Sequence, residues 1–314
     1  WQLVETSEQT KKHCMMSSSS CHSGLSAVTL NMVREGFFGD LIHGEGNYIH
    51  DRVSSRSRWE RDEHGWFGFR PWRLDENVGR NGNLYPQHGL GPLAQMMDLN
   101  YGDQMDYLVS MSGNDFTMGG LMEKLAAEDD YFKPYVGKEF RGNMNVTVIR
   151  THKGRTIMLQ HDISSPRPGS RFQLISGTNG IIRHYPQPAR MATSHDGWFS
   201  EEKFNVLVEE YTPEMTKRFN QRVRGTQNRE NLRSYARVNE MDWRLIDCLR
   251  NGLPLEMDVY DAALWSSITP LTEWSVANRS NSVDVPDFTA GAWKTNDWGM
   301  DISLQKGGGT TKIL

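Results

Sequence analysis

The spacing of hydrophobic residues predicts helices along much of the chain. Apolar side chains recur with a period close to 3.6 residues in a central segment, at Leu90, Leu93, Ala94, Met96, Met97 and Leu99. Pro92 suits the first turn of that helix, because its missing N–H would have no intrahelical partner there. The same reasoning predicts helices over 1–12 and 25–33 and, with an interruption at Pro270, over 258–277. Residues 200–250 are largely helical by composition.

Shorter apolar or alternating runs predict strands. They fall at residues 13–16, 41–49, 107–111, 145–150, 155–161 and 172–176. His152-Lys153-Gly154 joins two of these runs as a hairpin, since glycine readily adopts a positive φ. The second half of the chain therefore predicts a mostly antiparallel sheet, whereas a helix followed by the short strand at 13–16 is typical of the end of an α/β unit.

The segments between these elements are predicted as loops. Residues 52–70 have no period and exceed an ordinary connection, so we expect a loop near the functional site. Residues 113–138 predict an insertion with a helix at 120–128. From Val283 the chain is expected to be extended, and Gly307-Gly308-Gly309 predicts that residues 301–314 form a flexible tail.

Composition excludes several classes of protein. The 35 basic and 39 acidic side chains leave a net charge of -4 and form no basic block, so no nucleic-acid partner is expected. All apolar runs fall short of the roughly 20 residues that span a bilayer, so we expect a soluble chain without a membrane span. Cys14, Cys21 and Cys248 include no CxxC pair and predict packed thiols. The 314 residues allow two units, and Trp1 leads us to expect that the chain begins within a longer protein.

The stretch most suggestive of chemistry runs from Trp72 to Leu99. Tyr85 and His88 lie in a turn rich in glycine and proline that leads into the central helix. A helix N-terminus favours a polar or anionic group, and histidine is the side chain that titrates near neutral pH. The alternative is that His88 only caps or packs against the helix, and spacing alone does not decide between the two.

Eleven short blocks stand in order from Val4 to Thr289. They are Val4-Glu5-Thr6-Ser7-Glu8, His13-Cys14-Met15-Met16, Leu30-Asn31-Met32-Val33, Tyr48-Ile49-His50-Asp51, Trp72-Arg73, Leu84-Tyr85-Pro86-Gln87-His88-Gly89-Leu90-Gly91-Pro92, Leu159-Gln160-His161-Asp162, Ser165-Pro166-Arg167-Pro168, Ser176-Gly177-Thr178-Asn179-Gly180, Asp258-Val259-Tyr260-Asp261-Ala262-Ala263 and Val285-Pro286-Asp287-Phe288-Thr289. Together these blocks resemble the NAD-dependent glycosidases of glycoside hydrolase family 109, which are α-N-acetylgalactosaminidases. The resemblance therefore covers nearly the whole chain.

The resemblance implies an α/β plus α+β fold. Residues 1–36 would be the end of a Rossmann-type NAD-binding domain. Residues 37–300 would form a substrate-binding domain with a largely antiparallel open sheet, of the glucose–fructose oxidoreductase and inositol dehydrogenase (Gfo/Idh/MocA) type. Such domains often pack sheet to sheet, so a homo-oligomer through the sheet is expected, without a defined number of subunits. The family also occurs in periplasmic or secreted bacterial proteins, and the sequence leaves the compartment open.

The reaction implied is cleavage of a glycan or glycoside with NAD as cofactor. NAD⁺ takes hydride from C3 of the sugar, the ketone acidifies the proton on C2, the leaving group is eliminated, water adds and the hydride returns. A histidine or tyrosine serves as base in this scheme, and the paired carboxylates of ordinary glycosidases are not needed.

The site residues implied by the resemblance fall in the blocks quoted above. His88 and Tyr85 would handle protons near C2 and C3, and Arg73 would bind sugar oxygens. Tyr48 would line the sugar, and His50 the sugar and the nicotinamide. Substrate binding is thus expected of Tyr48, Arg73, Tyr85 and His88, and cofactor binding of His50 and of Ser18, which occupies a family site position; for each, the alternative is a structural hydrogen-bonded residue.

The chain departs from the family pattern at three places. The GxGxxG fingerprint after a strand is absent, and the family's nucleotide-binding residues would mostly precede Trp1. A site glutamate of the family is replaced by Ser18, with His22 where a tyrosine would fall, and serine cannot exchange a proton as a carboxylate does near neutrality. Gly169 replaces a tyrosine that would contact the sugar.

These departures keep other functions open. The chain could be a catalytically impaired sugar-binding relative, or an NAD(P)-dependent oxidoreductase acting on a free sugar or polyol. A metal site built from His43, His50, His64 and His88 is a remoter alternative, because no spacing among them is a zinc signature, and no metal is expected.

Overall fold

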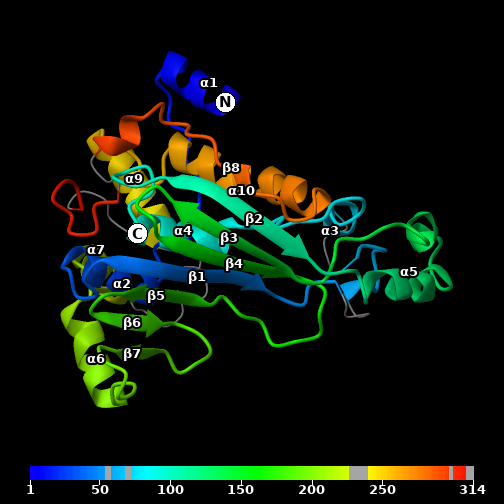
Figure 1. The fold of residues 1–314 in the computed structure, drawn as a ribbon, viewed down its shortest axis with the longest axis horizontal. Coiled ribbons are helices and arrows are strands. Elements are labelled where there is room, and N and C mark those ends of the chain that lie inside the picture. The colour runs from blue at the N-terminus through cyan, green and yellow to red at the C-terminus, as the bar shows by residue number, and fades with distance from the viewer. Residues whose placement is uncertain (54–57, 68–71, 226–239, 297–299, 309–314) are drawn as a thin grey trace.

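The fold is a single open sheet with helices packed on one side (Figure 1). The computed structural model describes residues 1–314 except 54–57, 68–71, 226–239, 297–299 and 309–314. Its elements, in order, are α1 (Gln2–Thr10), α2 (Gly24–Arg34), β1 (Leu41–Ile49), α3 (Trp72–Asp75), α4 (Gln87–Met96), β2 (Met105–Ser112), α5 (Met118–Ala126), η2 (Asp130–Tyr135), β3 (Asn145–Thr151), β4 (Thr156–Asp162), β5 (Gln173–Gly177), β6 (Gly180–Arg183), β7 (Arg190–Ala192), α6 (Glu201–Glu210), α7 (Glu214–Gly225), α9 (Glu240–Asn251), α10 (Val259–Ala277), β8 (Val283–Asp284) and η3 (Ala292–Lys294).

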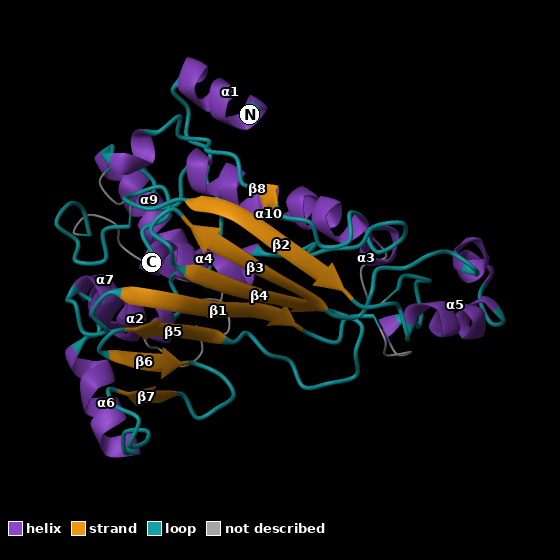
Figure 2. Cartoon of the chain, viewed as in Figure 1, coloured by secondary structure: helices purple, strands orange, loops and turns teal. Residues whose placement is uncertain are grey.

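The eight strands are ordered β7-β6-β5-β1-β4-β3-β2-β8. β1 and β4 pair in parallel, and the other neighbours pair antiparallel. The predicted mostly antiparallel sheet is therefore confirmed, including the β3–β4 hairpin, in which Gly154 has φ +81°. The parallel pair brings the carboxyl ends of β1 and β4 to the same edge of the sheet, where the chain leaves toward α3 and α5 (Figure 2).

α4 lies directly on β1 because two glycines allow the backbones to meet. A Cβ on Gly46 would lie 2.4 Å from the carbonyl oxygen of Gly89, and a Cβ on Gly89 would lie 2.8 Å from the amide nitrogen of Asn47. Any larger side chain at either position would push helix and strand apart. This close approach holds the first turn of α4 against the end of β1.

One hydrophobic core joins the sheet to the helices behind it. This core fully buries Leu93 of α4 and Met97, which directly follows α4. It also fully buries Trp265 and Ile268 of α10. α2, from the segment predicted as a Rossmann remnant, packs into the same core through residues such as Leu30. The domain boundary predicted at residue 36 stays a prediction. No helix in the described part of the chain is long and apolar enough to cross a membrane.

Two predicted details of the helices are wrong. α4 begins at Gln87, because Pro86 with φ -72° and ψ -30° already takes a helical conformation. Pro92 therefore lies inside the helix, where its missing N–H leaves the carbonyl of His88 without the usual helical partner. α10 runs through Pro270 without the predicted interruption, since burial of residues such as Trp265 outweighs the local cost of proline.

Two predicted segments at the ends of the chain also differ. Residues 13–16 form no strand; Met16 donates one backbone hydrogen bond to Met257 at 3.2 Å, and no strand ladder forms there among the described residues. Residues 301–308 of the predicted flexible tail are anchored by Ile302 and Leu304, which are buried in the core, while Ser303, Gln305 and Lys306 are exposed. The rest of that tail, 309–314, lies outside the described residues.

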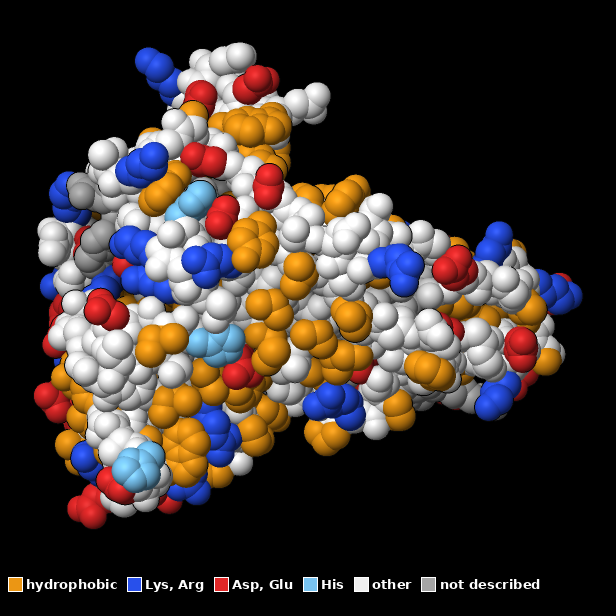
Figure 3. All heavy atoms as spheres, viewed as in Figure 1, with side chains coloured by type: hydrophobic (Ala, Val, Ile, Leu, Met, Phe, Trp, Pro, Cys, Tyr) orange, Lys and Arg blue, Asp and Glu red, His pale blue; other side chains and the backbone are white. Residues whose placement is uncertain are grey.

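The helices and loops that the structure describes leave the other face of the sheet uncovered. Figure 3 shows hydrophobic side chains gathered across the middle of this face. Its exposed members include Tyr107 and Met111 of β2 and Val148 of β3, which are 38%, 66% and 39% exposed.

Candidate active site

Five aromatic rings meet at the carboxyl ends of β1 and β4, and we call them the ring cluster. They are Tyr48, His50, Tyr85, His88 and His161. Tyr48 and His161 are register partners in the parallel pair, so the sheet itself places them side by side. His88 is carried against Tyr48 by the Gly46–Gly89 contact, because it directly precedes Gly89. The site thus depends on one strand pairing and one glycine contact.

Tyr48 is the centre of the ring cluster and is 4% exposed. The His88 ring stacks on it at 5.0 Å between centroids, with 15° between the planes. Tyr85 meets Tyr48 edge-on at 4.8 Å and His88 at 4.9 Å, and His50 lies 4.6 Å from Tyr48. The structure therefore brings together the four rings that the sequence predicted as site residues.

Two arginines border the ring cluster. The Arg73 guanidinium lies 4.4 Å from the ring of Trp72 and 5.6 Å from that of Tyr85. Arg171 donates a hydrogen bond from Nε to Nε2 of His50 at 3.2 Å, and its guanidinium lies 5.9 Å from the ring of Tyr48. Arg73 thus lies beside the ring cluster, and its role there stays a prediction; Arg171, which no motif marks, was not among the predicted residues.

The electrostatics of the site favour neutral histidines. Burial, followed by the charges of Arg52, Arg171 and Arg73, lowers the pKa of His50 from 6.5 to about 4. Burial and the same three arginines, together with His50, lower the pKa of His88 to about 4. None of the groups that shift these two pKa values is a carboxylate. Both imidazoles are therefore unprotonated near pH 7 and able to accept a proton.

His161 was missed as a site residue because its place depends on the β1–β4 register. Burial, with a smaller effect of Arg141, lowers the pKa of His161 well below its usual value. Its side chain is 1% exposed. Its ring centroid is 6.1 Å from that of Tyr48, so it supports the inner side of the ring cluster.

Ser18 and Gly169, where the chain departs from the family pattern, differ in their surroundings. Ser18 is 2% exposed, and its Oγ pairs with Oγ of Ser20 at 2.9 Å; no described contact joins it to the ring cluster. Gly169 lies beside His50, since a Cβ there would be 2.8 Å from Nδ1. A tyrosine at 169 would therefore require His50 to move.

A cavity of about 220 Å³ opens next to Tyr85. It is lined by Met16, Leu84, Tyr85, Pro86, Gln87, Trp265, Ser266 and Thr269. This volume is smaller than the roughly 300–1,000 Å³ of pockets that bury drug-sized ligands. The cavity would take a single small ring or part of a larger molecule.

The four histidines considered for a metal site lie in different settings. His43 hydrogen-bonds Thr156 at 2.7 Å on the uncovered face, and His64 is exposed beside Glu63. His50 and His88 belong to the ring cluster. Across the residues the structure describes, no three His, Cys, Asp or Glu side chains are grouped to hold a metal ion. The three cysteines are free thiols.

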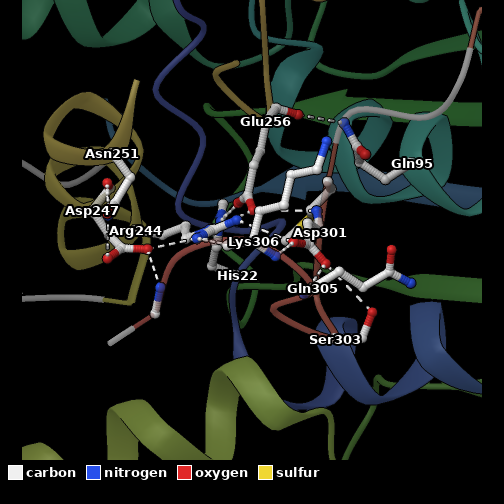
Figure 4. A network of polar contacts seen from close by, with 12 residues as sticks. His22, Gln95, Arg244, Asp247, Asn251, Glu256, Asp301, Ser303, Gln305 and Lys306 are labelled. Atoms are coloured by element: carbon white, nitrogen blue, oxygen red, sulfur yellow. Dashed lines mark hydrogen bonds and ion pairs between the residues drawn. The ribbon is translucent and has the colours of Figure 1, made fainter. Parts of the chain in front are cut away.

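A second polar site, away from the ring cluster, is a buried set of charges that we call the ionic clasp (Figure 4). Arg244 pairs with Glu256 at 2.7 Å, Asp247 at 2.6 Å and Asp301 at 3.5 Å. His22 pairs with Glu256 at 3.0 Å. Although burial raises it, the hydrogen bonds and charges of His22 and Arg244 hold the pKa of Glu256 below its ordinary value. The ionic clasp joins α9 to the N-terminal and C-terminal segments.

Comparison with known proteins identifies the family. The family described as "Glycosyl hydrolase 109, C-terminal domain" matches residues 25–295. The chain belongs to glycosyl hydrolase family 109. The chain is 41% identical over 297 residues to a glycosyl hydrolase family 109 protein of Phocaeicola vulgatus, covering 94% of this chain and 69% of that protein. It is 42% identical over 296 residues to an alpha-N-acetylgalactosaminidase of Bacteroides fragilis, covering 94% and 67%.

Family 109 relatives are longer than this chain. A member from Shewanella woodyi is 41% identical over 305 residues, which are 94% of this chain and 62% of that protein. The chain thus spans between 62% and 69% of the length of these three relatives. Because family matching begins at residue 25, α2 falls almost entirely within the C-terminal domain that the family describes.

Solved structures support the same fold at low identity. An oxidoreductase domain protein from Kribbella flavida matches with a TM-score of 0.54 at 12% identity, covering 85% of this chain and 64% of that one. A levoglucosan dehydrogenase solved with NADH and L-sorbose matches with a TM-score of 0.53 at 14% identity, covering 86% and 65%. The predicted α/β fold of the Gfo/Idh/MocA type, with a largely antiparallel open sheet, is confirmed.

Proposed function

We propose that this family 109 chain carries the sugar site of a glycosidase that removes terminal α-N-acetylgalactosamine or a related hexosaminide. The observation that supports this most is the ring cluster, with two histidines kept neutral and near each other. Ordinary glycosidases depend on a pair of carboxylates, whereas the groups that govern His50 and His88 are all cationic or neutral. The Bacteroides fragilis relative is named an alpha-N-acetylgalactosaminidase, which supports N-acetylgalactosamine as the sugar.

The proposed cofactor is NAD, which when bound would take hydride from C3 of the sugar and later return it. The residues here would hold only part of it, since the cavity beside Tyr85 measures about 220 Å³. That cavity joins Met16 of the N-terminal segment to the start of α4, so a small ring bound there would reach the ring cluster. His50 remains our candidate on the cofactor side, and the pairing of Ser18 with Ser20 gives Ser18 a lesser claim.

The proposed proton transfers follow from the state of His88. A neutral imidazole can accept the C2 proton once C3 is a ketone, and its position in the first turn of α4 adds a dipole that opposes protonation. The Tyr85 hydroxyl, whose ring meets His88 edge-on, would exchange the proton at the C3 oxygen. Arg73 would hold sugar oxygens from beside Tyr85, and Tyr48 would line the sugar.

The test is hydrolysis of an aryl α-N-acetylgalactosaminide by the protein with NAD⁺ supplied. We expect release of the aryl group that depends on NAD⁺, without net accumulation of NADH, because the hydride returns. Binding of NAD⁺ can be followed through quenching of the ten tryptophans. Accumulation of NADH with a free sugar would instead support an oxidoreductase, and sugar binding without hydrolysis would support an impaired relative; either result would contradict the proposal.

We also propose that the uncovered sheet face mediates assembly of identical subunits. Tyr107, Met111 and Val148 expose apolar surface on it, which favours burial against another surface. Light scattering should give an oligomeric mass that falls to the monomer mass in Met111→Asp. A monomeric wild-type protein would contradict this.

A further inference from the structure

The charged side chains that act most strongly on His50 and His88 are positive, although the chain as a whole is slightly negative. The chain carries a net charge of -4, yet the charged groups that act on His50 and His88 include three arginines. A site for a neutral sugar needs hydrogen-bond partners but gains little from an excess of positive charge. The excess therefore calls for an anionic partner.

Arg171 is the most available of these cations. It is exposed, it follows Gly169 and Ser170 on the segment that leads into β5, and it contacts His50 and Tyr48. Within the described chain no carboxylate forms an ion pair with it. The guanidinium therefore lies beside His50 and Tyr48 without a counter-ion among the described residues.

Arg52 is a second arginine that forms no ion pair with a carboxylate among the described residues. Its backbone N–H is fixed by a 2.8 Å hydrogen bond to Ile163, beside the end of β4. Its Nε is buried and has no hydrogen-bond partner among the described residues. The nearby buried carboxylate, Asp162, is already engaged by the backbone N–H groups of Ser164 and Ser165.

We propose that Arg171, with Arg52, binds an oxyanion substituent on the sugar, so that the preferred substrate is a sulfated or carboxylated hexosaminide. This inference rests on the proposed function for the identity of the sugar. A guanidinium is suited to such groups because it offers parallel donors to two oxygens. Arg171 would be a specificity-determining residue that meets the substituent, while the ring cluster meets the sugar ring.

The absence of a side chain at Gly169 is consistent with this role. A Cβ at position 169 would lie 2.8 Å from Nδ1 of His50, and Nε2 of the same ring accepts a hydrogen bond from Arg171. A bulky residue at 169 would displace His50 and with it the partner that orients the Arg171 side chain. The replacement at 169 and the uncompensated Arg171 thus act on the same His50 ring.

The test is calorimetric binding of N-acetylgalactosamine and of its 4- and 6-sulfates to the chain. We expect at least one sulfate to bind ten-fold or more tightly than the neutral sugar. In Arg171→Gln the difference should fall below three-fold, and Arg171→Lys should recover part of it. Arg150→Gln, which removes the same charge from the exposed side of β3, is the matched control and should keep the full difference.

Equal affinities for neutral and sulfated sugars, no measurable binding of either sulfate, or an equal loss for both in Arg171→Gln would overturn the inference. The pyrophosphate of NAD⁺ is the other source of an oxyanion. A loss of NAD⁺ affinity in Arg171→Gln, with the preference for sulfate unchanged, would assign the cation to the cofactor and also overturn it. Because binding is read without turnover, a preference for sulfate without hydrolysis would contradict only the proposed function.

Discussion

The ring cluster and the ionic clasp both combine histidine with arginine, and they differ in what balances the charge. In the ionic clasp, Arg244 has three carboxylate partners and His22 is paired with Glu256. In the ring cluster, His50 has Arg171 as its partner, and no described carboxylate pairs with either of them. Charges that are paired within the protein need no ligand, whereas the unpaired positive charge beside the ring cluster favours the binding of an anion. We therefore expect a structural role for the ionic clasp and a binding role for the ring cluster.

The largest expected effect in the ring cluster follows from His88→Ala. Removing a general base should lower kcat for an aryl α-N-acetylgalactosaminide by about 10²–10⁴-fold, while thermal unfolding stays close to wild type. His152→Ala, which removes a histidine stacked on Trp293 away from the cluster, is the control. Turnover within three-fold of wild type in His88→Ala would remove His88 from the mechanism.

The corresponding test of the ionic clasp is Arg244→Met. It leaves Asp247 and Glu256 buried without their cation, so the free energy of unfolding should fall by about 3–5 kcal/mol. Arg171→Met should change it by no more than about 0.5 kcal/mol, because Arg171 is exposed and forms no ion pair with any residue that the structure describes. Urea unfolding measures the free energy of unfolding of both variants. Similar losses in the two would contradict the difference between the ionic clasp and the ring cluster.

Gly46→Ala tests the contact that positions the ring cluster. The new Cβ would lie 2.4 Å from the Gly89 carbonyl oxygen, so we expect a loss of about 1–3 kcal/mol of stability together with reduced turnover. Gly120→Ala in α5 is the matched control, since its Cβ meets nothing within 4 Å, and should be neutral or stabilising. Wild-type stability in Gly46→Ala would show that α4 can shift without cost.

The smallest expected effect is on pH dependence. His50 and His88 have a pKa of about 4 in the folded chain against 6.5 as the ordinary value. The unfolded chain therefore binds more protons between these values, and the free energy of unfolding should fall as the pH drops from 6.5 toward 4. The acidic limb of kcat/KM should also lie near pH 4 and move upward in Arg171→Gln, which removes a charge that opposes protonation. A limb near 6.5 in wild type would contradict the electrostatic account.

Much of the fold could be predicted from the chain because its periodicity is clear. Alternation places β1 at 41–49 as observed, and the predicted helix at 25–33 becomes Gly24–Arg34. The errors concern places where packing outweighs local preference, as at Pro270 in α10. The predicted start of α4 is wrong because either Pro86 or Pro92 could begin the helix, and Pro86 already has helical φ and ψ angles.

The site could be predicted only in part. Tyr48, Arg73, Tyr85 and His88 lie in short blocks shared with the family, so resemblance finds them without a structure. His161 depends on the parallel register with Tyr48, and Arg171 on a hydrogen bond to His50 across 121 positions. His161 lies in the quoted block 159–162, which did not mark it as a site residue, and Arg171 lies in no quoted block.

The central claim is that the ring cluster removes and restores the proton on C2 of the sugar. The most direct measurement is NMR of the sugar released from methyl α-N-acetylgalactosaminide by the protein with NAD⁺ in D₂O. We predict that the wild-type protein releases sugar with deuterium at C2, and that His88→Ala releases about 10²–10⁴-fold less of this sugar in the same time. A product that keeps its original C2 proton while the glycoside is cleaved would contradict the account.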